Sequence, residues 1–97
     1  MYLEIVTPDK TLFTGDSNYV NVPGTKGSFG ILKDHAAIVS TLKAGTIKVL
    51  QVEGGYNKAN VDVEESELNI NEDKELFFDV KGGVVEVNNN QIIVLAE

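Results

Sequence analysis

VPGTKGSFGILKDHAAIVSTLKAG, residues 22–45, combines four glycines and a proline with the only histidine of the chain. Glycines at this density indicate backbone that turns sharply or lies close to another group. Pro23-Gly24 and Gly27 predict a tight turn between two strands, and Gly30 predicts a bulge or a close backbone approach. The stretch therefore predicts a β-hairpin followed by an exposed segment of small side chains.

The rest of the chain repeats short β-branched and aromatic runs between turn signals, which is the pattern of an all-β sandwich or barrel. We expect strands at residues 2–6, 11–13, 19–22, 28–32, 37–42, 46–52, 76–80, 84–87 and 92–96. Gly82-Gly83 and Asn88-Asn89-Asn90 are expected to be connecting turns. The best helical candidate, residues 33–43, is interrupted by β-branched side chains, so we expect no long helix.

Length and composition indicate one small domain without disulfides. The chain has 97 residues, no cysteine, and 15 acidic residues against 8 lysines, for a net charge of −7. This length suits a single domain over residues 1–97. The acidic balance and the lack of arginine argue against a nucleic-acid partner, because phosphates require clustered cations. The lack of cysteine excludes a Cys-based zinc site and a thiol nucleophile, and no apolar run reaches the roughly 18 residues of a membrane-spanning helix.

Most of the acidity lies in residues 57–75, which contain seven carboxylates and two lysines, a net charge of −5. Apolar residues alternate there in two short runs, at 61–63 and 68–70, which predicts an inserted hairpin with a charged tip; a loop is the alternative. The carboxylates lack the D-x-[DN]-x-[DN]-G pattern of a calcium loop. We therefore expect a solvated charged face and no metal site.

Asp34, His35 and either Ser28 or Ser40 are the residues from which a catalytic triad could be assembled. Adjacent residues of an extended chain point to opposite faces, so Asp34 is poorly placed to orient the imidazole of His35. The chain lacks a G-x-S-x-G elbow, and Lys26 precedes a glycine and a strand, unlike the lysine of a phosphate loop. We expect no enzymatic activity, and His35 is interpreted as a packing or contact residue.

Three stretches of the sequence together carry a family resemblance. They are Leu3–Pro8 with Leu12, Phe13 and Gly15; Val22–Gly27 with Phe29, Gly30, Leu32, His35, Ala36, Leu42, Lys43 and Gly45; and Gly82-Gly83 with Val85–Val87 and Val94–Ala96. In these residues the chain resembles the N-terminal β-sandwich domain of the ε subunits of F-type ATP synthases. The resemblance implies a flattened β-sandwich of two antiparallel sheets with about eight to ten short strands.

The resemblance further implies a non-catalytic rotor subunit in the central stalk, which binds the γ subunit and the c-ring and helps couple ion flow and rotation to ATP synthesis. The residues that it places at the c-ring are Gly24, Thr25, Lys26, Gly27 and Ser28. Those that it places at γ are His35, Ala36 and Ala37. It implies no cofactor. Association with the membrane, at the cytoplasmic face of the bacterial inner membrane, would occur only through the complex.

The sequence departs from the family pattern at several places. Many members carry an acidic residue where Ser28 stands, so a charged contact is not implied there. The family's Pro-Gly-His-Ala-Pro is replaced by Lys-Asp-His-Ala-Ala at residues 33–37, which predicts less local rigidity and adds the charge of Asp34. The acidic segment lies in a loop that is longer than usual. The sequence ends at Glu97, where most members continue into two helices. If these 97 residues are the whole protein, we expect it to lack the inhibition and ATP binding that those helices provide; if they are a fragment, this expectation concerns the fragment alone.

A free-standing β-sandwich that binds a ligand is the alternative interpretation. A stalk subunit should expose a sizeable apolar face to its partner, whereas a ligand-binding module should enclose one pocket with a few converging polar groups. Val20, Val22, Ile31 and Ile38 fit either a core or an interface. The sequence leaves both of these roles open.

Overall fold

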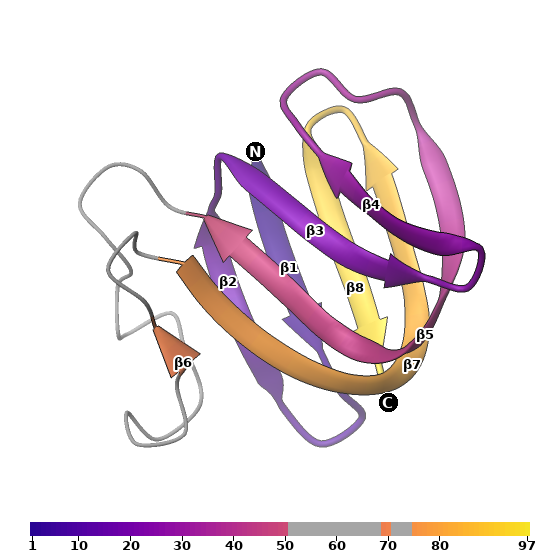
Figure 1. Ribbon diagram of the computed structural model, residues 1–97. Helices are drawn as coiled ribbons and strands as arrows, with labels where there is room; N and C mark the ends of the chain where they lie inside the picture. The colour runs from indigo at the N-terminus through magenta and orange to yellow at the C-terminus, as the bar shows by residue number, and fades with distance from the viewer. Residues whose placement is uncertain (51–68, 71–74) are drawn as a thin grey trace.

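The computed structural model describes residues 1–50, 69–70 and 75–97, which form strands, turns and short connections (Figure 1). The strands are β1 (Tyr2–Val6), β2 (Thr11–Asp16), β3 (Tyr19–Gly24), β4 (Gly27–Ile31), β5 (Ile38–Leu50), β6 (Asn69–Ile70), β7 (Glu75–Asn88) and β8 (Gln91–Ala96). The predicted all-β fold without a long helix is confirmed over these ranges. Within them, no helix has the length and apolar character needed to cross a membrane.

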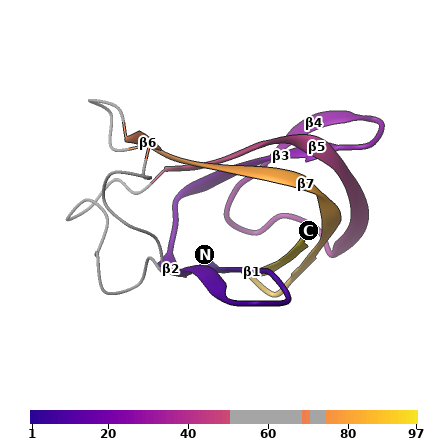
Figure 2. The ribbon, with the colours of Figure 1, turned by 90° about the horizontal axis from the view of Figure 1, so that it is seen from below.

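All eight strands belong to one sheet with the order β2-β1-β8-β7-β5-β3-β4, to which β6 adds by pairing with β7. β5 and β7 contain 13 and 14 residues. Residues 38–43 of β5 pair with 82–87 of β7, and residues 45–50 pair with 75–80. Figure 2 shows both strands bending between two layers, so the sheet folds over on itself. Its two layers are joined by shared strands and are not separate sheets.

The pairing of the terminal strands is a second difference from the expected pair of antiparallel sheets. β1 lies beside β8 in parallel, from Tyr2 opposite Gln91 to Val6 opposite Leu95. The other strand pairs are antiparallel. The parallel pair places the first and last strands of the chain side by side in the middle of one layer.

Two predicted strand breaks are wrong. The strands expected at 37–42 and 46–52 are continuous in β5 as far as Leu50, beyond which residues 51–52 lie outside the described residues. Gly82-Gly83 lies inside β7 and is not a turn. Gly82 and Gly83 have φ angles of 153° and 145°, which side chains with a Cβ rarely adopt. A Cβ at Gly83 would also overlap the carbonyl oxygen of Leu95. The two glycines therefore let β7 bend closely against β8 without reversing the chain.

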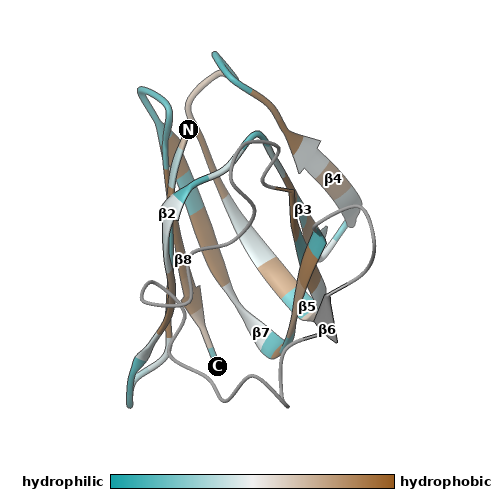
Figure 3. Cartoon of the chain, turned by 90° about the vertical axis from the view of Figure 1, so that its left-hand side faces the viewer, coloured by the Kyte–Doolittle hydropathy of each residue, from teal (hydrophilic) through white to brown (hydrophobic). Residues whose placement is uncertain are grey.

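The core fills the space between the two layers. Side chains alternate between buried and exposed along β1 and β8, as expected for strands with one solvated face. Figure 3 shows the resulting hydrophobic bands along the strands. Phe13 is fully buried and meets the ring of Phe78 edge to face, with centroids 6.0 Å apart. Val20, Val22 and Ile31 are fully buried and belong to the core, while Ile38 packs against it from a half-buried position.

The acidic segment predicted at 57–75 falls largely outside the described residues. Only Asn69 and Ile70, together with Glu75, are described there, and β6 pairs antiparallel with the start of β7 through Asn69 opposite Phe77 and Ile70 opposite Leu76. The predicted inserted hairpin or loop and its charged tip therefore stay predictions.

Candidate functional site

The β3–β4 turn carries the five residues predicted to contact the c-ring. Thr25 and Lys26 form its tip, between Gly24 and Gly27, which lie opposite each other in the ladder. Gly24 is buried, and a Cβ added there would lie only 2.6 Å from the carbonyl oxygen of Gly27 and 3.0 Å from the ring of Phe29. The other four, Thr25 to Ser28, are exposed. The turn thus presents four residues to solvent, and Gly24 shapes it from inside.

The tip of this turn is held against β5. The backbone N–H of Thr25 donates to the carbonyl oxygen of Thr41 at 3.0 Å, and the hydroxyls of the two threonines lie 2.9 Å apart. An open groove of about 610 Å³ runs between the turn and the start of β5. Phe29 and Ile38 contribute apolar surface to it, and most of its other lining residues are exposed. It lacks the enclosure expected of a ligand pocket.

The segment between β4 and β5 carries the residues predicted to contact γ. Ala36 and Ala37 are exposed and His35 is half-buried. The N–H of His35 donates to the carbonyl oxygen of Leu32 at 3.1 Å, and its ring Nδ1–H donates to the carbonyl oxygen of Ala36 at 2.7 Å. The structure does not bring this segment together with the β3–β4 turn. Figure 1 shows the segment at the top of the molecule, where β5 begins, and the turn lower down at the right, beside β5.

The residues of the hypothetical triad do not converge. The carboxylate of Asp34 accepts a hydrogen bond from Asn90, and the hydroxyl of Ser40 donates to the carbonyl oxygen of Thr41. The described part of the chain also holds no group of three or more histidine and acidic side chains that could bind a metal ion. The geometry of these residues supports contacts and not catalysis.

Sequence reasoning missed two residues that fix these segments, Thr41 and Asn90. Thr41 is an ordinary strand residue until its hydroxyl is found beside Thr25, so no local signal marks it. Asn90 lies in the predicted Asn-rich turn, where Asn89 and Asn90 have φ angles of 50° and 61°. Asparagine tolerates this backbone conformation, and the turn was predicted on that basis, but its contact with Asp34 was not.

The outer face of the layer formed by β1, β8, β7 and the start of β5 exposes large apolar side chains. Tyr2, Val39, Ile93 and Leu95 have exposed fractions of 43%, 69%, 38% and 56%, and we call these four residues the outer apolar face. The register places Val39 opposite Glu86, Glu86 opposite Ile93, and Ile93 opposite Glu4. Apolar and acidic side chains therefore alternate along one row.

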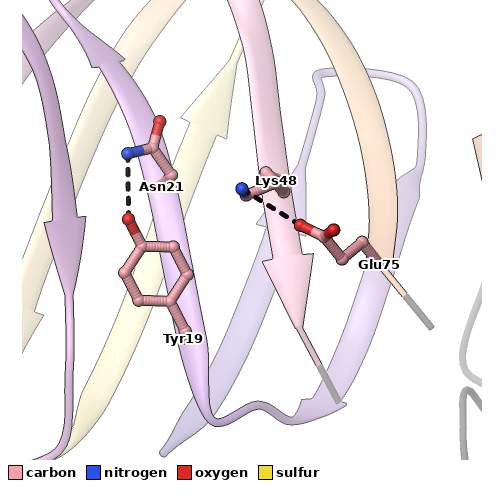
Figure 4. A network of polar contacts seen from close by, with 4 residues as sticks. All are labelled: Tyr19, Asn21, Lys48 and Glu75. Carbon is pink, nitrogen blue, oxygen red and sulfur yellow. Dashed lines mark hydrogen bonds and ion pairs between the residues drawn. The ribbon is translucent and has the colours of Figure 1, made fainter. Parts of the chain in front are cut away.

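The outer face of the other layer holds a polar cluster (Figure 4). Lys48 pairs with Glu75 at 3.0 Å and lies 5.9 Å from the ring centroid of Tyr19. The hydrogen bond from Lys48 to Glu75, and then the charge of that carboxylate, raise the pKa of Lys48. The Tyr19 hydroxyl accepts a 3.2 Å hydrogen bond from Asn21, and its ring occupies the space that a Cβ at Gly30 would need. The predicted close approach at Gly30 is confirmed, and the cluster is structural.

Known proteins that the chain is similar to belong to one family. Residues 1–63 match the family described as ATP synthase, Delta/Epsilon chain, beta-sandwich domain. The ATP synthase epsilon chain of Campylobacter fetus is 32% identical over 97 residues, covering 100% of this chain and 60% of that protein. The epsilon chain of Chlorobaculum tepidum is 34% identical over 95 residues, covering 98% of this chain and 86% of that protein. The chain spans only 48–60% of the relatives from Campylobacter fetus, Campylobacter hominis and Desulforamulus reducens.

Solved structures show the same fold at lower sequence identity. A chain from the central stalk and c-ring structure of the Tetrahymena thermophila mitochondrial ATP synthase matches with a TM-score of 0.68 and 18% identity, over 99% of this chain and 62% of that one. A chain of the Euglena gracilis mitochondrial ATP synthase matches with the same TM-score and identity, over 97% of this chain and 48% of that one. Together with the sequence match over residues 1–63, the shared fold leads to one conclusion: the chain belongs to the β-sandwich family of ATP synthase delta/epsilon subunits.

Proposed function

We propose that this chain is a non-catalytic rotor subunit of an F-type ATP synthase, which binds the γ subunit and the c-ring and helps couple ion flow and rotation to ATP synthesis. Family membership supports the assignment to this complex. In that role the chain reaches the membrane only through the complex, at the cytoplasmic face of a bacterial inner membrane. It needs no cofactor, since the catalytic chemistry belongs to other subunits.

The outer apolar face is the observation that carries the proposal. Four large apolar side chains exposed on one strand layer are typical of a surface that another protein covers. Val39 of this face lies two residues after Ala37, so the predicted γ contact at His35, Ala36 and Ala37 continues into it. The open groove beside the β3–β4 turn fits the alternative ligand-binding module less well, because ligand pockets are more enclosed.

Residues 24–28 are proposed to contact the c-ring. Thr25 to Ser28 are exposed at one turn, and the hydrogen bonds between Thr25 and Thr41 hold that turn in place. The acidic chain suits partners with basic surfaces, whose attraction would raise the association rate and weaken with salt. The turn itself differs from the acidic chain as a whole, because Lys26 is the charged residue among residues 24–28 and its charge is positive.

Co-elution with γ tests the assignment to the stalk. The chain and the γ subunit from the same source are mixed at micromolar concentration and separated by size-exclusion chromatography. A stable one-to-one complex is expected. Two separate peaks would refute the γ contact and would favour a ligand screen directed at the groove.

Charge reversal at the turn tests the c-ring contact. Lys26→Glu changes an exposed side chain at the tip of the turn, so we expect the fold to persist while ATP-driven ion pumping in reconstituted vesicles falls. Lys10→Glu is the matched control, because Lys10 is an exposed lysine in another turn. Equal pumping by the two variants and the wild type would count against a c-ring contact at residues 24–28.

A further inference from the structure

Two turns that are distant in sequence are joined by a reciprocal pair of side chains. The backbone N–H of Asp34 donates to Oδ1 of Asn90 at 2.6 Å, and Nδ2 of Asn90 donates to Oδ1 of Asp34 at 3.1 Å. Asp34 lies in the segment before β5, and Asn90 lies in the β7–β8 turn. Figure 1 shows these two turns next to each other at the upper end of the molecule. We call this pair the Asp34–Asn90 clasp.

The clasp joins two residues with unusual backbone conformations. Asp34 has a φ of 65° and Asn90 a φ of 61°, in the left-handed region that disfavours most side chains. Asp and Asn enter this region more readily because their short polar side chains form local hydrogen bonds. Here those side chains bond to each other, so each stabilises the turn that carries the other.

Backbone hydrogen bonds attach the β7–β8 turn to the rest of the fold and close the turn that carries Asp34. The N–H of Tyr2 donates to the carbonyl oxygen of Asn90 at 3.0 Å, which attaches the β7–β8 turn to the start of β1. On the other side of the clasp, the N–H of His35 donates to the carbonyl oxygen of Leu32. The segment that carries His35 is therefore tied through Asn90 to the two central strands β1 and β8.

We propose that Asp34 and Asn90 are positioning residues, which hold residues 35–37 in the conformation that a γ-type partner binds. The proposal rests on the proposed function. The sequence predicted reduced rigidity here because residues 33–37 lack the prolines of the family pattern. The clasp supplies an alternative restraint through side chains, and a segment ordered before binding loses less entropy when the complex forms.

Glycine substitutions test the bonds of the clasp without excluding the backbone conformation at either position. Asn90→Gly removes both bonds of the clasp, whereas Asp34→Gly removes the bond between the two side chains and keeps the backbone N–H of residue 34 as a donor to Asn90. Both variants still allow a positive φ. Asn89→Gly is the matched control, since Asn89 has a φ of 50° in the same turn and takes no part in the clasp. The exchanged pair Asp34→Asn with Asn90→Asp is the rescue, because the amide at position 34 can then donate to the carboxylate at position 90.

Two readouts on the full chain test the proposal, namely amide hydrogen exchange at residues 34 and 35 and affinity for γ. We expect Asn90→Gly, which loses both bonds, to speed exchange there and to weaken γ binding by about tenfold each. Asp34→Gly, which loses one bond, should change both values by about threefold. The exchanged pair should return both values to within about twofold of the wild type. Asn89→Gly should change neither.

The outcomes distinguish the clasp from the proposed function. Exchange and affinity in Asp34→Gly and Asn90→Gly that match Asn89→Gly would overturn the positioning role. Faster exchange with unchanged γ affinity would also overturn it, because the segment would then be held without serving the contact. A wild-type chain that does not bind γ would refute the proposed function, and exchange with rescue by the exchanged pair would then decide whether the clasp orders the segment.

Discussion

Gly83→Ala should destabilise the fold because the bend of β7 leaves no room for a Cβ at this position. Gly83 lies in β7, where this strand bends between the layers, and its φ of 145° is strained for a residue with a Cβ. The added Cβ would also overlap the carbonyl oxygen of Leu95 and lie 3.1 Å from the Cα of Ala96. Both neighbours are backbone atoms of β8, so neither can move aside as a flexible side chain could.

The expected loss of stability has two parts. A non-glycine residue in a disfavoured backbone region costs about 1–3 kcal/mol. Forcing an extra carbon into a packed site costs about a further 1–3 kcal/mol. Gly27→Ala is the control, because Gly27 also has a positive φ, 131°, but a Cβ there meets nothing within 4 Å. The effect of alanine on the unfolded chain is the same in both variants and cancels in the comparison.

Thermal and urea unfolding of the wild type, Gly27→Ala and Gly83→Ala, followed by circular dichroism, measure this difference. We expect Gly83→Ala to be less stable than Gly27→Ala by about 2 kcal/mol, the middle of the packing range. For a domain of this size that corresponds to a Tm lower by about 8–16 °C. Equal unfolding free energies for the two variants would refute the argument that the β7 bend requires the absence of a Cβ.

Three further predictions concern stability, and urea unfolding checks each of them. Phe13→Ala should cost about 3–5 kcal/mol, because the ring is fully buried against Phe78; a loss below 1 kcal/mol would contradict its place in the core. Ser17→Ala should leave stability unchanged or raise it by about 1 kcal/mol, since the buried hydroxyl has no partner among the described residues; a large loss would show that it has one. The pKa of Lys48 is raised, so its pairing with Glu75 stabilises the fold below pH 10.5, and this contribution is lost as the pH rises through the folded-state pKa. The wild type should therefore lose more stability than Lys48→Met at high pH, and parallel pH profiles of the two would contradict this.

The candidate site shows how far local sequence information reaches. The β3–β4 turn was predicted from Pro23, Gly24 and Gly27, because turn geometry depends on residues that are neighbours in the chain. The close approach at Gly30 was also predicted, but the ring of Tyr19 that causes it was not. From the sequence, Asp34 was interpreted as a source of charge. In the structure its bonds to Asn90, 56 positions away, join two turns.

The sequence by itself determined the class of the fold. Alternating apolar residues and frequent turn signals are local properties, and they were sufficient to predict an all-β domain with no long helix. Local patterns also placed most strands within a few residues of their observed bounds. The family resemblance, carried by short motifs in order along the chain, supplied the expected assembly and contact residues.

Only the tertiary structure decided how these strands combine. Gly82-Gly83 has the local signature of a turn, yet the residues on both sides of it pair with β5, so one long strand bends where a turn was expected. The parallel pairing of β1 with β8 and the clasp between Asp34 and Asn90 join opposite parts of the chain. Such contacts depend on which surfaces remain available after the layers pack, and that information is absent from any short window of the sequence.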